Sequence, residues 1–489
     1  MRKILGLLPA LIFFVNITSG VAASEPIVDT GQVKCYDNTH EIPYPLPGTS
    51  FFGQDAEYVS NPPSYRDNGN GTVADLNTGL MWSKAVDKSK VSLIEAKKIA
   101  TGMTLAGHSD WRVPNIKELY SLIDFSGYTG AGEYNEGAPS NAIPFINTDC
   151  FDFMYGQVDQ GERYIDAQWV TSTKYVSTTM GGAETLFGVN FADGRIKGYG
   201  YKRPGSSREK KFYARYVRGK AYGNNNFVDN GDGTITDRAT GLMWLKADSG
   251  KPMNWKEALF YSETLEYAGY DDWRLPDAKE LQYIVDYSRS PDTTNSPAID
   301  PVFQTTSIVN EAGEKDYPCF WTSTTHLDGP NPGGNAAYVA FGRAIGKMQG
   351  KVMDVHGAGA QRSDPKAGSP MFRGPQGDAV RCENFVRCVR GGSATLRTSA
   401  PREDKNKYPY NIKKYGSADK SSRMPPIDRK GPEGFVKRLD RNGDGKVSRQ
   451  EFDGPPQAFS HHDRNKDGYL TENEAPKGPP PSKRGAPPH

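Results

Sequence analysis

Two twelve-residue stretches near the C-terminus place side-chain oxygens at regular intervals. They read "DRNGDGKVSRQE" from Asp440 and "DRNKDGYLTENE" from Asp463. An EF-hand loop needs oxygen donors at positions 1, 3, 5, 7 and 9, glycine at position 6 and a two-oxygen carboxylate at position 12. Both stretches meet this pattern, which predicts one Ca2+ ion in each. The predicted ligands are Asp440, Asn442, Asp444, Lys446 (through its carbonyl), Ser448 and Glu451 in the first loop, and Asp463, Asn465, Asp467, Tyr469 (through its carbonyl), Thr471 and Glu474 in the second.

Residues beside these loops must hold them in place. Val447 and Leu470 both stand at loop position 8, and we expect them to pair in a short strand that links the loops. Apolar residues that could form the core of the unit are Phe435, Val436, Leu439, Phe452 and Phe459. Pro476 and the prolines after it exclude a full exiting helix. The sequence therefore predicts a small α-helical EF-hand pair over 432–476, in which calcium is structural or only weakly sensed, followed by a disordered Pro-rich tail over 477–489.

Two other stretches look like calcium loops but lack the closing ligand. They read "DNGNGTVADLNTGLMW" from Asp67 and "DNGDGTITDRATGLMW" from Asp229. Position 6 is threonine instead of glycine in both, and position 12 is Thr78 or Thr240 instead of glutamate. Asn-Gly and Asp-Gly are strong β-hairpin signals. The pattern favours a turn between two strands over the alternative, a calcium site.

These two stretches belong to a duplicated region. The offset of 162 between Trp82 and Trp244 holds without a gap from the hairpin through the D-W-R motif, and later landmarks recur at shorter offsets. Repeat one covers about 65–219 and repeat two about 220–392. Capping-box pairs open two short helices in each repeat, and the rest alternates β-prone pieces with Gly-rich loops, so the predicted class is α+β. The capping pairs are Ser92 with Glu95, Asn115 with Glu118, Asn254 with Glu257, and Asp277 with Glu280.

The strings D-N-G-[DN]-G-T, T-G-L-M-W, D-W-R-[LV]-P-x-x-K-E-L, T-S-T and V-R-G occur in this order in both repeats. In this order they resemble the Lcl C-terminal domain family, a bacterial extracellular family known from the tail of a collagen-like adhesin. Residues 30–61, within an N-terminal segment over 24–64, are similar to the lead-in that such proteins often carry. The resemblance implies two tandem C-type-lectin-like domains and a role in adhesion to glycans. The chain has no Gly-X-Y stretch, so the adhesin's stalk is missing.

Aromatic and basic residues recur at fixed points of the two repeats. The tryptophans can anchor the core, which their apolar neighbours favour, or they can form a platform for sugar stacking. Arg112 and Arg274 each follow the second tryptophan, and we expect a buried ion pair with a nearby carboxylate rather than a ligand contact. The four tryptophans are Trp82, Trp111, Trp244 and Trp273.

The N-terminus predicts export. Residues 1–23 combine a basic start, an apolar run and small residues before a cleavage position, a pattern typical of a secretory signal peptide rather than a membrane anchor. No later segment is long and apolar enough to span a bilayer. We therefore expect a secreted, periplasmic or cell-envelope protein, in which disulfides can form. Five cysteines leave one unpaired; the suggested pairs are Cys35 with Cys150 and Cys319 with Cys388, and a staple between Cys382 and Cys388 is an alternative.

Charge says little about partners. Sixty basic and 58 acidic residues leave a net charge of +2, which does not suggest a nucleic-acid partner. Segment 393–431 is polar and rich in Lys and Arg, and we expect a flexible tether. A basic patch for acidic glycan or lipopolysaccharide is the alternative.

Known catalytic patterns are missing: the sequence has no HExxH, G-x-S-x-G or P-loop motif, so we expect no enzyme activity. The favoured interpretation is an exported calcium-binding protein whose twin lectin-like domains bind a glycan or protein ligand at the cell envelope. One alternative is a structural or interaction protein of the periplasm that calcium stabilises. The other is a modifying enzyme that depends on Cys382 and Cys388. The oligomeric state stays open.

Overall fold

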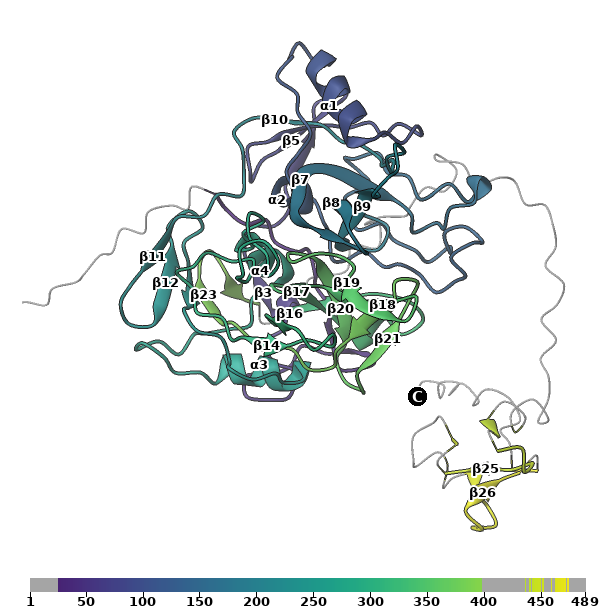
Figure 1. The fold of residues 1–489 in the computed structure, drawn as a ribbon. Coiled ribbons are helices and arrows are strands. Elements are labelled where there is room, and N and C mark those ends of the chain that lie inside the picture. The colour runs from purple at the N-terminus through teal and green to yellow at the C-terminus, as the bar shows by residue number, and fades with distance from the viewer. Residues whose placement is uncertain are drawn as a thin grey trace, which may run out of the picture. The chain divides into compact units, whose positions relative to one another are not determined.

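The computed structural model has two compact units, residues 1–415 and 416–489 (Figure 1). In the first unit the structure describes residues 25–397. In the second it describes residues 436, 439–440, 442–449, 451–452, 459, 462–471 and 473–474. The predicted signal peptide, Phe435, the linker beyond residue 397 and the Pro-rich tail lie outside the described residues.

Each repeat opens with a small antiparallel sheet that its own last strand completes. Repeat one has the order β10-β6-β5-β4, and repeat two has the equivalent order β23-β13-β12-β11. The final strand carries the V-R-G motif in both copies. The strands are β4 (Tyr65–Asp67), β5 (Thr72–Asp75), β6 (Met81–Ser83) and β10 (Val217–Arg218) in the first copy, and β11 (Phe227–Asp229), β12 (Thr234–Asp237), β13 (Leu242–Leu245) and β23 (Val389–Gly391) in the second.

Four α-helices lie within residues 25–397. All four begin at the predicted capping boxes, with the N-cap side chain accepting an N3 amide and the N3 glutamate accepting the N-cap amide. The helices are α1 (Leu93–Gly102) and α2 (Ile116–Tyr120) in the first copy, and α3 (Trp255–Glu263) and α4 (Ala278–Tyr283) in the second. Strands predominate over these helices, so the α+β class is confirmed in a mainly β form.

The two copies share one six-stranded antiparallel sheet with the order β16-β17-β20-β9-β8-β7. The halves meet in the middle through a single ladder pair, Gln361 with Ile196. From this central pair outward, the strand order is β9, β8, β7 in the first copy and β20, β17, β16 in the second. Strands at the same distance from the centre correspond to each other, as a two-fold axis would require. The strands are β7 (Gln168–Thr179), β8 (Ala183–Asn190) and β9 (Arg195–Lys202) in the first copy, and β16 (Cys319–His326), β17 (Asn335–Ala340) and β20 (Gln361–Pro365) in the second.

The remaining elements belong to the lead-in, to loops, and to additions in the second copy. The lead-in strand β3 (Tyr58–Val59) pairs with β24 (Thr395–Leu396), so the first residues of the predicted linker are part of the folded unit. The other elements are β1 (Cys35–Tyr36), β2 (Glu41–Ile42), β14 (Ile308–Val309), β15 (Lys315–Asp316), β18 (Ile345–Met348), β19 (Lys351–Asp354), β21 (Met371–Arg373), β22 (Asp378–Val380) and the 3-10 helices η1 (Asp55–Glu57), η2 (Val158–Gln160) and η3 (Pro332–Gly334).

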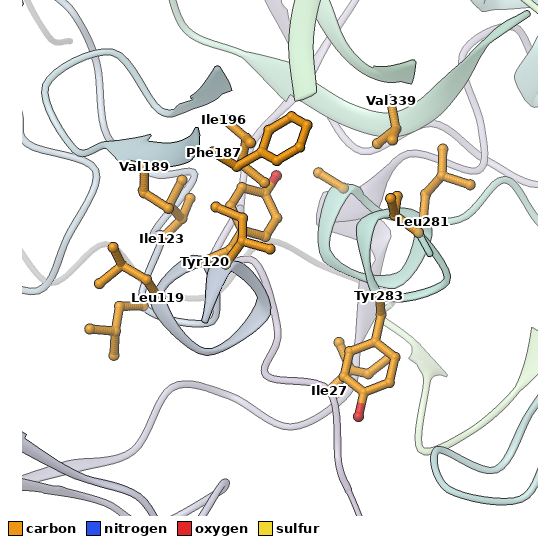
Figure 2. Packing of buried hydrophobic residues seen from close by; sticks show 14 of the residues in the cluster. Ile27, Leu119, Tyr120, Ile123, Phe187, Val189, Ile196, Leu281, Tyr283 and Val339 are labelled. Carbon is orange, nitrogen blue, oxygen red and sulfur yellow. The ribbon is translucent and has the colours of Figure 1, made fainter. Parts of the chain in front are cut away.

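A continuous apolar core crosses from one copy to the other. Figure 2 shows Leu119 and Tyr120 of α2, Leu281 and Tyr283 of α4, and Ile27 of the lead-in within this cluster. Burial of the four repeated tryptophans confirms that they anchor the core. Their exposed fractions are 0% for Trp82, 4% for Trp111, 0% for Trp244 and 1% for Trp273.

The short helices α2 and α4 exchange equivalent contacts across the copies. The Lys117 ammonium donates to the Tyr283 carbonyl (2.5 Å), and the Lys279 ammonium donates to the Ser121 carbonyl (2.9 Å). Both members of each pair differ by the repeat offset of 162. The two copies therefore meet as the subunits of a symmetric dimer do.

The predicted disulfides are wrong, because all five cysteines are free thiols. Cys319 accepts a hydrogen bond from Arg381 (3.2 Å), while Cys388 donates to the Ser262 hydroxyl (3.4 Å). Burial raises the pKa of both Cys319 and Cys388 to about 12, which keeps their sulfurs protonated. These two thiols are therefore buried core groups with separate partners.

Asp354 should make stability depend on pH. Its carboxylate accepts the Tyr175 hydroxyl (3.0 Å) and the Gly357 amide (2.7 Å), and within residues 25–397 no Lys or Arg forms an ion pair with it. Burial raises its pKa to about 7, and Asp292 adds to the shift. The folded state thus holds this proton more tightly than the unfolded state, and the carboxyl lowers stability as pH rises from about 4 to about 7.

Substituting Asp354→Asn removes this titration. The free energy of unfolding of the wild type, minus that of the variant, should fall by on the order of 1–3 kcal/mol between pH 4.5 and pH 7.5. Urea unfolding of both proteins at the two pH values measures the difference. A difference that stays constant with pH would contradict the assignment.

Candidate functional site

The C-terminal unit brings its two oxygen-rich loops together through β25 (Val447–Ser448) and β26 (Tyr469–Leu470). Val447 pairs with Leu470, which confirms the predicted link between the loops. The described residues Val436 and Phe459 are helical and buried, as expected for the segments that enter each loop. The core of the unit consists of Val436, Leu439, Val447, Phe459 and Leu470, with Phe452 packed against it.

In the first loop, the first and last carboxylates hold the turn closed. Asp440 accepts the amides of Gly443 and Gly445, each at 2.7 Å. Glu451 accepts the Ser448 amide (2.9 Å) and hydroxyl (2.7 Å), and it is only 8% exposed. Gly445 has a φ of 78°, a conformation that disfavours any residue with a Cβ atom.

The second loop repeats this arrangement at the same positions. Asp463 accepts the Gly468 amide (3.1 Å) from the glycine with a φ of 84°. Glu474 accepts the Thr471 amide (3.2 Å) and hydroxyl (2.9 Å). The hydrogen bond from the Thr471 hydroxyl holds the pKa of Glu474 below its usual range, so this carboxylate is charged at neutral pH.

The predicted ligands thus lie on one compact loop in each case, with the position-12 glutamates inside and most other donors exposed. Among the described residues, no three His, Cys, Asp or Glu side chains gather closely enough to hold a metal ion. The carboxylates instead accept backbone amides. A cation would have to replace some of these hydrogen bonds, and the donor set of carboxylate, amide, hydroxyl and carbonyl oxygens is the one that a hard divalent cation prefers.

The two look-alike stretches in the repeats are hairpins, as predicted. Asp67 and Asp229 each accept a glycine amide two residues ahead, which forms the turn. Asp67 also pairs with Lys84, directly after β6, and Asp229 pairs with Lys246, directly after β13. The negative charge of each aspartate, which would attract a cation, is therefore already neutralised by a lysine ammonium group.

Both predicted arginine ion pairs form, and that of Arg274 is buried as expected, whereas the Arg112 side chain is 34% exposed. Arg112 binds both oxygens of Glu118 and Arg274 binds both oxygens of Glu280, with all four distances at 2.6 Å. Glu118 and Glu280 are also the N3 residues of α2 and α4. These ion pairs are thus structural. Both guanidinium groups are engaged by a glutamate, so neither arginine is assigned a contact with a ligand.

A wide cleft of about 1450 Å³ lies in the first copy between the approach to α1, the η2 turn and the end of β9. Its lining is rich in Lys and Arg but also contains carboxylates. Three of those carboxylates are engaged: Glu162 binds Lys90 (2.6 Å), Glu95 binds Lys211 (3.3 Å), and Asp166 binds Arg163. Lys90 is further held by the Asp166 carbonyl at 2.8 Å.

Four cations of the cleft form no ion pair within residues 25–397. Lys88, Arg203 and Arg208 are exposed, and the Lys210 ammonium lies over the Tyr199 ring at 4.6 Å from its centroid. Glu209 is the one lining carboxylate that lacks an ion pair in the same range. The free charge of the cleft is therefore positive, although the whole chain is close to neutral.

Two basic residues of this cleft are not repeated in the second copy. At the offset of 162, Gly250 stands in place of Lys88 and Pro252 in place of Lys90. The sequence analysis did not identify the cleft, because its residues come from segments far apart in the chain and none forms a motif. The difference between the repeats is the signal that could have revealed the cleft. Basic residues that occur in only one copy are not needed for the fold that both copies share, which points to a separate role.

Comparison with known families identifies the repeats. The model of the Lcl C-terminal domain matches residues 71–218 and 233–356, together more than half of the chain. The chain belongs to the Lcl C-terminal domain family. The two matched stretches agree with a duplicated Lcl domain, and the fold extends the second Lcl copy beyond residue 356 to β23.

Proteins of the Lcl family are typically extracellular or surface proteins, which makes this chain surface-related. Over the described residues, the structure has no helix with the length and apolar character needed to cross a membrane. No curated protein and no solved structure matches the chain. The family, the fold and the two sites therefore carry the functional argument.

Proposed function

We propose that this Lcl protein is an exported binding protein whose first copy holds an acidic polysaccharide at the cell envelope, with calcium bound in the C-terminal unit. The observation that carries the proposal is that Lys88, Arg203 and Arg208 line the cleft of the first copy, are exposed, and form no ion pair within residues 25–397. Arginine pairs well with sulfate and carboxylate groups because its planar fork matches two oxygens at once.

The size and chemistry of the cleft favour a polymer. Its volume of about 1450 Å³ exceeds the roughly 300–1,000 Å³ of most small-molecule sites. Gln157, Gln160 and Ser206 line it beside the cations and can donate to and accept from sugar hydroxyls. This arrangement suits a chain that carries both hydroxyl and anionic groups. The lectin-like character of the two copies and an adhesion role are part of the same proposal.

In the C-terminal unit, the twelve loop residues predicted above would hold two calcium ions. Calcium stiffens loops by gathering their oxygens, and extracellular modules of this kind bind it at roughly 10⁻⁴–10⁻³ M. Calcium in this role stabilises a binding protein and drives no chemistry. The protein acts by binding rather than by catalysis, since the five thiols are mostly buried and protonated.

A double variant, Arg203→Glu with Arg208→Glu, tests the polysaccharide cleft. Heparin, as a sulfated probe, should bind the wild-type full chain, and its affinity should fall at least about tenfold in the variant because four units of charge change within one cleft. Affinity should also weaken as salt rises from 50 to 500 mM, because exposed charges are screened. Isothermal titration calorimetry measures both effects, with neutral dextran as a non-binding comparison.

The matched control is Lys251→Glu with Lys256→Glu in the second copy, where both lysines are exposed and the change in net charge is the same. This control should keep the wild-type heparin affinity. Equal losses in both double variants would reduce the effect to overall charge. An unchanged affinity in the cleft variant would reject the cleft and favour the basic segment 393–431.

A further inference from the structure

The two copies build a pair of equivalent clefts beside α2 and α4. Thr173 accepts the Ile116 amide (3.0 Å) in one cleft, and Thr324 accepts the Ala278 amide (3.0 Å) in the other. We call them the open cleft, lined by Lys117, Thr173, Asp286 and Tyr287, and the filled cleft, defined by the equivalent residues Lys279, Thr324, Asp124 and Phe125. The lysine, aspartate and aromatic members of the two sets differ by the repeat offset of 162, and the threonines end the T-S-T motif of each copy.

The filled cleft contains the chain's own lead-in. The Phe125 amide donates to the Thr30 carbonyl (2.7 Å), and the Thr324 hydroxyl donates to the Asp55 carboxylate. The Gln32 side chain donates to the Thr325 carbonyl (2.7 Å) and accepts the Thr325 amide (2.9 Å). Two pieces of the lead-in thus satisfy this cleft: residues 30–32 supply a main-chain carbonyl and an amide side chain, and Asp55 of η1 supplies a carboxylate.

Glycine is required at one point of the inserted segment. Gly31 has a φ of 81°, and a Cβ atom there would lie 2.6 Å from the Asp124 carboxylate. The lead-in can therefore pass this aspartate only because residue 31 has no side chain.

The open cleft has the same walls without the inserted segment. It is a cavity of about 510 Å³, within the usual range of ligand sites. Within residues 25–397, the Tyr287 amide and the Thr173 hydroxyl have no acceptor, although their counterparts at Phe125 and Thr324 do. Lys117 is already held by the Gly223 carbonyl (3.1 Å) and the Asn225 side chain (3.0 Å), so it forms a wall of the cleft rather than a free cation.

We propose that the open cleft binds an extended peptide segment of a partner protein. A main-chain carbonyl of the peptide accepts the Tyr287 amide, as the Thr30 carbonyl accepts the Phe125 amide, and a glycine passes Asp286 as Gly31 passes Asp124. Main-chain hydrogen bonds of this kind give affinity to peptide recognition, and side-chain contacts give selectivity. The open cleft shares no lining residue with the polysaccharide cleft, so the two proposals stand or fall separately.

The probe is the capped peptide VDTGQVK, which reproduces residues 28–34 of the lead-in. The full chain should bind it saturably with a Kd below about 1 mM, through the open cleft, because the attached lead-in keeps the filled cleft occupied. The matched control peptide VDTAQVK should bind at least about fivefold more weakly, since alanine meets Asp286 as it would meet Asp124. Fluorescence anisotropy of labelled peptides measures both affinities.

Two variants locate the site. Ser288→Trp and Asn224→Trp each place a large side chain at the rim from an exposed position and should abolish peptide binding, while Lys251→Trp, in the second copy and outside the cleft, should not. Unchanged thermal unfolding confirms that the variants fold. No saturable binding, equal affinity for the two peptides, or binding that survives both rim variants would overturn the proposal. Displacement of the peptide by maltotriose would overturn it too, because the cleft would then take a sugar.

Discussion

Replacing Arg274 by alanine should lower the free energy of unfolding of the first unit by about 3–5 kcal/mol. The Arg274 guanidinium binds both oxygens of Glu280, and each side chain of the pair is 5% exposed. The charged partner holds the pKa of Arg274 above its usual range although burial opposes the charge. Without the arginine, Glu280 would remain buried as an uncompensated charge, and that penalty makes the loss large.

The repeat supplies a matched control for this prediction. Arg112 makes the same two hydrogen bonds to Glu118, but the Arg112 side chain is 34% exposed, so water can replace the guanidinium. Arg112→Ala should therefore cost less, about 1–2 kcal/mol. Urea unfolding of both variants, as full chains, measures the two losses. Equal losses would mean that exposure does not set the cost of breaking the pair.

Removing the closing carboxylates should abolish calcium binding. In the double variant Glu451→Gln with Glu474→Gln, each loop loses the charged, two-oxygen ligand at position 12. The wild-type full chain should bind calcium with a Kd in the range of about 10⁻⁴–10⁻³ M, and the double variant should show no measurable calcium binding in the same titration. Isothermal titration calorimetry against CaCl2, after treatment with chelator, measures both proteins.

The hairpin look-alikes provide the control for calcium. Asp67→Asn with Asp229→Asn removes two carboxylates from oxygen-rich turns in which a lysine already neutralises the charge. This double variant should bind calcium as the wild type does. Calcium heat that disappears with the hairpin aspartates, or that persists without the two glutamates, would show that the C-terminal loops are not the site.

Local structure was predictable from the sequence because the interactions that define it span a few residues. Asn115 and Glu118 cap α2 at a spacing of three, and Val447 and Leu470 were expected to pair because each stands at position 8 of its loop. The burial of Trp82 followed from its apolar neighbours. In the capping box, one motif contains both interacting residues. In the paired loops, the shared loop position fixes which residues lie opposite each other.

Long-range structure was not predictable in the same way. The seam between Gln361 and Ile196, the insertion of Thr30 beside Phe125, and the cleft around Arg203 all join segments far apart in the chain. A repeat offset reveals that two copies exist, but it does not reveal that they share a sheet. The predicted disulfides were wrong for a related reason: spacing in the sequence does not show which cysteines lie near each other, and Cys319 and Cys388 each have a separate hydrogen-bond partner in the fold.

The exchange of Lys117 and Lys279 across the copies has a consequence for how this protein can change. In a homodimer built from one gene, each substitution arises twice, and sites related by the axis must stay identical. A tandem duplication frees each half to diverge alone. The lead-in therefore occupies the filled cleft permanently, while the open cleft keeps its space for a ligand. Two identical subunits cannot encode this difference, because each would carry the same lead-in.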